Sequence, residues 1–312
     1  MKHAYTLLSL CFAFLLVARP TAAFVSKKEA RKITFALKQK DDTVLEETLL
    51  KISNPMNKKM FRNYLSHDQV RNLVEPVNGA EKIVTKWIYA NLKQPFSVTT
   101  SKHGDLIYVK ATTEAIENVF NVNSSTTDPI SVVPLILKPY VFAIYNAVET
   151  LPALLSTRRS NNFKGQFKGI DVDPQVIYKQ YGMSDADIGG KAAKNSQGVA
   201  AFEDAEFKQA DVDDFQKYYK LPSVKIGVLG PNNGGYFGEA GLDTQYITAS
   251  GRGVKSFFIS HEEFNLLDWC EEVLNMTQIP FVLSVSWGGG ESQYPLSHQT
   301  SANKCFQKLG TM

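Results

Sequence analysis

Two apolar, β-branched runs constrain the fold more than any other feature of the sequence. They are VKIGVLG at residues 224–230 and FVLSVSW at 281–287, and SFFI at 256–259 suggests a third strand between them. Near-continuous apolar runs of this length are typical of strands buried on both faces of a parallel sheet. Parallel strands need right-handed crossovers, and ligands bind at their carboxyl ends. We therefore predict an α/β region in the second half of the chain.

A helix is predicted after the third strand. Ser260 and Glu263 have the spacing of a capping box, which marks the start of a helix. The predicted helix has one apolar face, formed by Phe264, Leu267, Cys270 and Leu274.

The first half of the chain has a different pattern. LSHDQVRNLV at residues 65–74 indicates a helix, with Ser66 and Gln69 spaced as a capping box. The segment 79–92 is predicted to be a second helix. Its apolar residues recur at spacings of three and four and form one stripe: Ile83, Val84, Trp87, Ile88 and Leu92.

A hairpin and a further helix follow these two helices. Strand-like runs at 95–100 and 105–111 are joined by a turn at His103–Gly104, and residues 112–120 indicate a helix. The alternation of helices and strands predicts a small α+β unit with a ferredoxin-like arrangement.

The N-terminus has the pattern of a secretory signal peptide. Residues 1–23 combine a short basic start, an apolar run and a small-residue end at Ala22 and Ala23. The apolar run is shorter than the roughly 20 residues of a membrane span. We expect a protein of the secretory pathway with no membrane span. A net charge of +3 also argues against a nucleic-acid partner.

In a protein of the secretory pathway, disulfides and N-glycosylation are both possible. Cys270 and Cys305 remain after the signal peptide, and the sequence leaves open whether they pair or stay as buried thiols. Asn123 and Asn275 fit the N-glycosylation pattern. Residues 152–169 lack apolar periodicity and predict an exposed linker, in which Arg158–Arg159 is either a dibasic processing site or simply solvated.

Two acids follow the first apolar run. Glu239 and Asp243, in GEAGLDTQYI, lie four residues apart and therefore on one face of a helix. The spacing alone fits a solvated acidic face, part of a Ca²⁺ site, a glycosidase acid pair or a carboxyl relay. At this distance the two carboxyls are not easily ionised together.

Several ordered stretches resemble the sedolisin family, the serine-carboxyl peptidases, and within it the tripeptidyl peptidases of lysosomes. GEAGLDTQYITASG is similar to the family's glutamate–aspartate segment. LSHDQVRNLVEP and VTKWI resemble its activation prodomain. VDPQVIYKQYGMSDADIG resembles the entry to its catalytic domain, and VLSVSWGGGES its substrate-lining strand.

The resemblance implies a subtilisin-like parallel sheet preceded by a ferredoxin-like activation prodomain. The expected divisions are a signal peptide at 1–23, the prodomain at 24–151, a linker with the processing site at 152–169, and the N-terminal part of the peptidase domain at 170–312. The implied partners are peptide or protein substrates, and the prodomain itself against the catalytic domain.

The resemblance also implies roles for the two acids. Glu239 is the expected general base for a serine nucleophile, and Asp243 the residue that orients it. A carboxylate has a lower pKa than imidazole and stays competent as a base in an acidic compartment. Any pKa of such a coupled pair belongs to both residues.

Two family motifs are absent from the 312 residues. The oxyanion aspartate lies in a GDSG-like turn and the nucleophile in a GTSAS-like turn, and neither occurs. ANKCFQKLGTM at 302–312 resembles the helix just before the oxyanion aspartate. We therefore expect a C-terminally truncated chain that is inactive as written, without a cofactor, whose family Ca²⁺ site lies in the missing part.

Other nucleophile and base candidates are weak. Ser284 and Ser286 fall on one face of a strand and Ser292 in a loop. His261 is expected at a helix start and His298 in a loop. None is expected to be catalytic.

Two functions follow from these expectations. The first is an acid-active serine-type peptidase, lysosomal or extracellular, that releases N-terminal tripeptides when complete. The alternative is a non-catalytic product whose prodomain binds, inhibits or assists the folding of a full-length relative.

Overall fold

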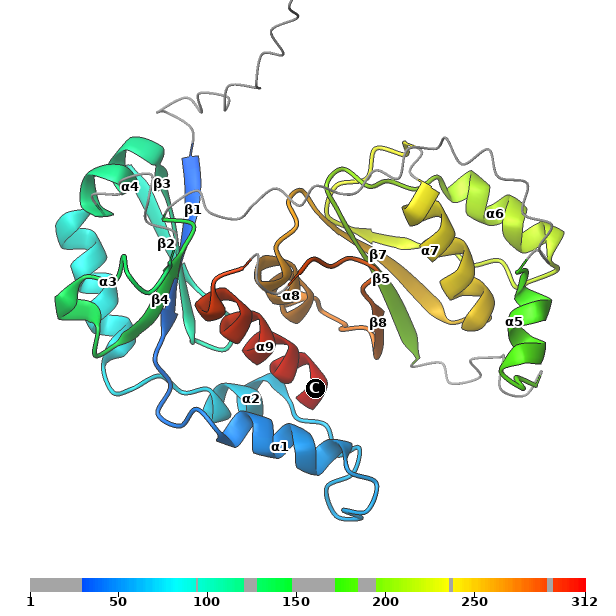
Figure 1. The fold of residues 1–312 in the computed structure, drawn as a ribbon, viewed down its shortest axis with the longest axis horizontal. Helices are drawn as coiled ribbons and strands as arrows, with labels where there is room; N and C mark the ends of the chain where they lie inside the picture. Colours follow the sequence, from blue (N-terminus) through cyan, green and yellow to red (C-terminus); the bar gives the residue numbers. More distant parts are fainter. Residues whose placement is uncertain are drawn as a thin grey trace, which may run out of the picture.

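The structure contains two four-stranded sheets that lie on either side of a pair of helices (Figure 1). It is a computed structural model. It describes residues 30–93, 95–120, 128–147, 172–184, 195–235, 238–290 and 294–312. The signal-peptide segment, the 152–169 linker and Asn123 lie outside the described residues.

The N-terminal sheet is antiparallel. Its strands are β1 (Ala30–Leu37), β2 (Phe96–Thr100), β3 (Leu106–Thr112) and β4 (Val141–Tyr145), in the order β2-β3-β1-β4. This order and direction, with helices after β1 and β3, are those of a ferredoxin-like unit, as predicted. The β2–β3 hairpin turns at Gly104, whose φ of +81° favours glycine. The sequence analysis missed β1 and β4.

The helices of this half are α1 (Val44–Ser53), α2 (His67–Leu73), α3 (Ala80–Asn91), α4 (Thr113–Phe120) and the 3₁₀ turn η1 (Leu135–Leu137). Helices α3 and α4 cover one face of the sheet, whereas α1 and α2 lie below it, where α1 packs against α9 (Leu296–Thr311) (Figure 1). The capping box predicted for α2 is confirmed, because Ser66 accepts from the Gln69 amide and the Gln69 side chain accepts from the Ser66 amide. Val84 and Ile88 of α3 pack against Phe35 and Val109 of the sheet in one apolar core.

The C-terminal sheet is parallel, as predicted. Its strands are β5 (Ser196–Phe202), β6 (Gly227–Leu229), β7 (Lys255–His261) and β8 (Val282–Ser284), in the order β6-β7-β5-β8. The sequence analysis missed β5, a central strand whose seven residues are all buried. Its sequence, SQGVAAF, is rich in small and polar residues that rarely signal a strand.

Five helices connect or cover this sheet: α5 (Pro174–Gln180), α6 (Gln209–Tyr218), α7 (Gly238–Ser250), α8 (Leu266–Asn275) and α9 (Leu296–Thr311). Successive side chains of β5 point to opposite faces of the sheet. Val199 and Ala201 join the core under α6 and α7, whereas Ala200 and Phe202 join the core formed with α8 and α9. The sheet is therefore covered on both faces.

Three local predictions around α8 and α9 were wrong. Ser260 lies inside β7, and the helix cap is Asn265, whose side chain accepts from the amides of Leu267 and Asp268 at 3.1 Å each. His261 ends β7 and does not begin a helix. His298 lies in the first turn of α9 and is buried.

The helices α8 and α9 join the two halves of the molecule. A disulfide links Cys270 of α8 to Cys305 of α9, with Cα atoms 6.1 Å apart, which settles the alternative left open above. The same apolar core contains Ala143 and Tyr145 of β4. The Tyr145 hydroxyl also donates to the Ser297 carbonyl at 2.8 Å. The N-terminal sheet therefore packs its second face on this helix pair.

Candidate functional site

The two acids singled out in the sequence lie on α7, beyond the carboxyl end of β6. The chain turns at Gly230, which has a φ of +86°. A Cβ there would lie 1.9 Å from the Ser260 carbonyl oxygen, so only glycine fits this close approach. The turn directs the chain from the sheet edge into the loop before α7, which begins at Gly238.

A carboxylate from the loop after β5 holds the segment before α7. Glu206 accepts from the Asn233 amide and the Asn233 side chain at 3.0 Å each, and from the Gly235 amide at 2.6 Å. The bond from the Asn233 amide is the main reason why the pKa of Glu206 is lowered. The sequence analysis missed this contact, since nothing in the local pattern pairs residues so far apart.

Glu239 and Asp243 differ in exposure. Glu239 is exposed in the first turn of α7, whereas Asp243, one turn later, is partly buried. Ser286, just after β8, donates from Oγ to Asp243 Oδ1 at 3.4 Å. The structure thus brings Ser286 to the acid pair, and the contact ties α7 to the segment that follows β8.

The surroundings of Asp243 favour its protonated form. Burial, and then the negative charge of Glu239, raise the pKa of Asp243 to about 6 from 3.8, and the bond from Ser286 opposes this shift. Below that pH, Asp243 carries a proton that it can donate in a hydrogen bond. A protonated carboxyl of this kind can orient a neighbouring group by donating a hydrogen bond to it.

The other serines and histidines considered in the sequence analysis do not contact the acid pair in the described residues. Ser284 is exposed on β8, and Ser292 lies outside the described residues. His261 Nε2 lies 3.7 Å from Glu272, and the His298 ring stacks on Tyr294.

In the described ranges, no three His, Cys, Asp or Glu side chains are grouped to hold a metal ion. Within the same ranges no helix has the length and apolar character for a membrane span.

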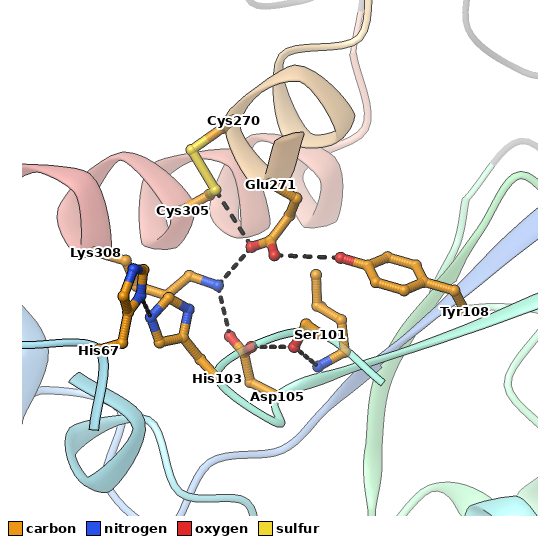
Figure 2. A network of polar contacts seen from close by, with 10 residues as sticks. His67, Ser101, His103, Asp105, Tyr108, Cys270, Glu271, Cys305 and Lys308 are labelled. Carbon is orange, nitrogen blue, oxygen red and sulfur yellow. Dashed lines mark hydrogen bonds and ion pairs between the residues drawn. A yellow bond between two sulfur atoms is a disulfide. The ribbon is translucent and has the colours of Figure 1, made fainter. Parts of the chain in front are cut away.

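A second polar cluster was missed by sequence analysis. Figure 2 shows Lys308 of α9 between two carboxylates, donating to Asp105 Oδ2 at 3.0 Å and to Glu271 Oε1 at 2.5 Å. The Tyr108 hydroxyl donates to the other Glu271 oxygen at 3.2 Å, and Ser101 Oγ donates to the other Asp105 oxygen at 2.9 Å. We call Lys308, Asp105 and Glu271 the buried ion cluster.

This cluster spans both halves of the chain. Asp105 precedes β3, Glu271 lies on α8 and Lys308 on α9. Cys305 Sγ lies 3.3 Å from Glu271 Oε1, a contact without a hydrogen because the sulfur is in the disulfide. The available signal was Lys308 itself, a charged residue three positions after Cys305 on the buried stripe of α9.

Opposite charges decide the ionisation of the cluster. Burial lowers the pKa of Lys308, but Asp105 and Glu271 outweigh it, so the net shift is upward. Burial raises the pKa of Asp105, but Lys308 and Ser101 bring it below the ordinary value. Burial dominates for Glu271, whose pKa is raised despite Lys308.

A histidine pair borders the cluster. His103 is fully buried, and burial followed by the charge of Lys308 lowers its pKa to about 4. Its Nε2 lies 3.1 Å from His67 Nδ1, and burial also lowers the pKa of His67. Burial therefore favours the neutral form of both imidazoles.

Comparison with known proteins finds one family model and several relatives that are similar to this chain. Residues 21–126 match the family model "Pro-kumamolisin, activation domain". The chain is 25% identical to tripeptidyl-peptidase 1 of Dictyostelium discoideum, with 90% of this chain and 55% of that protein aligned. It is 25% identical to the rat protein over 91% of this chain and 54% of that protein. It is 27% identical to the human protein over 90% of this chain and 54% of that protein.

The chain thus spans about half the length of these relatives. The family model covers strands β1, β2 and β3 of the N-terminal sheet, and the alignments to the relatives extend over both halves of the molecule. Residues 21–126 are therefore similar to a pro-kumamolisin activation domain, and the chain is similar along most of its length to tripeptidyl-peptidase 1 proteins.

Proposed function

We propose that this chain contributes the activation domain and the base–orienter pair of a serine-carboxyl peptidase that releases N-terminal tripeptides at acidic pH. Glu239 is the general base and Asp243 orients it. The observation that carries the proposal is the raised pKa of Asp243 beside Glu239, at the carboxyl end of a parallel sheet. Similarity to tripeptidyl-peptidase 1 supports the substrate class.

The proposed chemistry follows from these side chains. The hydroxyl proton of a serine passes to Glu239 as the serine oxygen attacks the scissile carbonyl carbon. Asp243, protonated below about pH 6, donates a hydrogen bond that holds the Glu239 carboxylate. Glu239 then returns the proton to the leaving amine.

The catalytic proposal concerns the complete protein. The sequence contains neither a GDSG-like nor a GTSAS-like turn, and Ser286 donates to Asp243. A base–orienter pair without a nucleophile and an oxyanion group has nothing to activate. We expect the 312 residues alone to cleave no peptide, and we propose that the complete protein acts in a lysosomal or extracellular acidic compartment.

The test begins with the full-length transcript that contains these codons. Its product is assayed at acidic pH on a peptide with a free N-terminus, beside the Glu239→Gln variant. The proposal expects tripeptide release that Glu239→Gln abolishes. Cleavage that survives Glu239→Gln contradicts the assigned base.

A second candidate rests on the separate core of the N-terminal half. Its sheet and α3 bury Phe35, Val84 and Ile88 with no contribution from the C-terminal sheet. A unit with its own core can bind a complete relative in trans as an inhibitor or a folding aid. If the transcript ends at Met312 and its product cleaves nothing, binding of the purified chain to a complete relative tests this candidate directly.

A further inference from the structure

Reciprocal hydrogen bonds join the loop after β5 to the loop before α7. Glu206 accepts from the amides of Asn233 and Gly235 at 3.0 and 2.6 Å. In the opposite direction, the side-chain oxygen of Asn232 accepts from the Phe207 amide at 3.2 Å. We call these contacts the loop clamp. Because each loop both donates to the other and accepts from it, the clamp fixes the path of the chain just before α7.

The segment that carries Glu206 also contacts α7 through the apolar core. Ala205 and Phe207, on either side of Glu206, are buried in the same core as Ala240. Ala240 follows Glu239 in the first turn of α7. This segment is therefore connected to the start of α7 in two ways, by hydrogen bonds to the preceding loop and by side-chain packing.

The clamp requires both a carboxylate and a glycine. Glu206 Oε1 accepts from the amide and the side chain of Asn233, and Oε2 accepts from the Gly235 amide. A side-chain amide has one oxygen and one NH₂ group, so it cannot accept all three bonds. A Cβ at Gly235 would lie 2.0 Å from Glu206 Oε2, so any other residue there would displace the carboxylate.

The Glu206 carboxylate stays charged at a lower pH than an ordinary glutamate. The bond from the Asn233 amide is the main cause of its lowered pKa, whereas the pKa of Asp243 is raised to about 6. Between these two pKa values, Asp243 is protonated while Glu206 is ionised. The clamp therefore persists under the acidic conditions in which we propose that the acid pair acts.

We propose that Glu206 is a positioning residue for Glu239, because it holds the loop before α7 and so sets the distance between the Glu239 and Asp243 carboxyl groups. This role rests on the proposed function of Glu239 as the base. A general base must lie within hydrogen-bond reach of the proton that it takes, so a small shift of the first turn of α7 affects it directly.

The titration of Asp243 reports the position of Glu239 without any catalysis. The negative charge of Glu239 is one cause of the raised pKa of Asp243, and this contribution falls as the two groups move apart. The charge of Glu206 is not among the causes of that shift. A change in the Asp243 midpoint after a substitution of Glu206 therefore reflects a movement of Glu239.

The test measures the Asp243 midpoint by carboxyl-carbon NMR in the 312-residue chain and in two variants. Glu206→Gln removes at least one bond of the clamp, and Gly235→Ala displaces the carboxylate without changing any charge. Hydrogen exchange at the Gly235 amide, which should become faster, shows that the clamp is broken. We expect the midpoint in both variants to fall from about 6 toward that of Glu239→Gln. If Glu206→Gln does not fold, Gly235→Ala tests the same contact.

Asp204→Asn is the matched control. It removes an equal charge from an exposed residue of the same loop that makes none of the clamp contacts. Its φ of +59° is one that asparagine tolerates. The control should keep the wild-type midpoint. The proposal is overturned if the Gly235 amide exchanges faster in the two variants while the Asp243 midpoint does not change, or if the exchange itself does not change. It is also overturned if Asp204→Asn lowers the midpoint as much as Glu206→Gln.

Kinetics of the complete protein separate this inference from the proposed function. Glu206→Gln should lower kcat by about 10-fold or more and change KM little, because the base moves while the substrate contacts remain. If Glu239→Gln leaves cleavage intact, the assigned base is wrong, and the NMR comparison still decides whether Glu206 positions Glu239. If Glu239→Gln is inactive and Glu206→Gln has the wild-type kcat, the positioning role is overturned.

Discussion

The buried ion cluster and the α7 acid pair each contain two carboxyl groups, yet the pKa of an aspartate shifts in opposite directions at the two sites. In the cluster, Lys308 lies between Asp105 and Glu271 and is sealed from solvent. On α7, Glu239 and Asp243 are partly open to solvent, and Ser286 is the neutral neighbour that bonds Asp243. The pKa of Asp105 falls and that of Asp243 rises.

The difference shows how a buried cation changes the ionisation of nearby carboxyl groups. With Lys308 in place, one carboxyl stays ionised and the cluster fixes two halves of the chain to each other. Without a cation, the pair holds a proton near the pH of an acidic compartment. The first arrangement links the two halves of the chain, and the second is the one that we propose for proton transfer.

Removing the cation should have the largest effect. Lys308→Met leaves two buried carboxyls without a partner, so we expect the free energy of unfolding to fall by about 3–5 kcal/mol. Denaturant unfolding measures the loss, and limited proteolysis reports whether the N-terminal half detaches. Lys225→Met, which breaks an exposed pair with Asp213, is the control and should change almost nothing. A loss as small as that of the control would show that the cluster does not hold the two halves together.

Breaking the disulfide should come next. Cys270 and Cys305 are 35 residues apart, and a loop of this length corresponds to about 2–4 kcal/mol of stability. The double variant Cys270→Ala with Cys305→Ala should unfold at lower denaturant concentration than the wild type. Wild-type protein kept in a reductant should match the double variant. If the reductant leaves the wild type unchanged, the two thiols do not form the stabilising link described above.

The acid pair should give a smaller, pH-dependent effect. A carboxyl whose folded pKa is raised stabilises the protein below its unfolded pKa, and this contribution is lost as the pH rises through about 6. Asp243 is only partly buried, so solvent screening leaves a loss of about 1 kcal/mol between about pH 4 and pH 7. Asp243→Asn should remove that part of the pH dependence, which unfolding measurements at the two pH values detect. An unchanged slope in the variant would contradict the raised pKa.

Removing the capping box of α2 should lower the free energy of unfolding by as much as the Asp243 effect or less. Ser66→Ala removes one half of the capping box at the start of α2, which costs about 1 kcal/mol. Thermal unfolding followed by circular dichroism measures the change, and Ser66→Thr, which can retain the cap, is the conservative control. If Ser66→Ala destabilised the protein as much as Lys308→Met, local capping would matter as much as the long-range cluster.

The sequence predicted elements whose signal is local. The α2 capping box, the α3 stripe and the β2–β3 hairpin follow from residues close together in the chain, and each was confirmed. Strand β5 was missed because its small residues gain their β structure from two neighbouring strands. Ser260 was wrongly predicted to be a cap, because it lies in β7, which ends only at His261.

The two sites differ in the same way: one follows from residues close together in the sequence, and the other from residues far apart. The α7 pair was visible, since helical spacing alone brings Glu239 and Asp243 to one face. The buried ion cluster was not, because Asp105 and Lys308 are distant in sequence and meet only when the N-terminal sheet docks on α9. Likewise, the bond from Ser286 to Asp243 depends on β8 lying in the same sheet as β6 and β7.

The most direct test of the account is the titration of Asp243 by carboxyl-carbon NMR, in the wild type and in Glu239→Gln. The account predicts a midpoint near pH 6 in the wild type, and a lower midpoint in Glu239→Gln, because the negative charge of Glu239 contributes to the shift. A midpoint near the ordinary aspartate value of 3.8 that is the same in both proteins would contradict a coupled base–orienter pair.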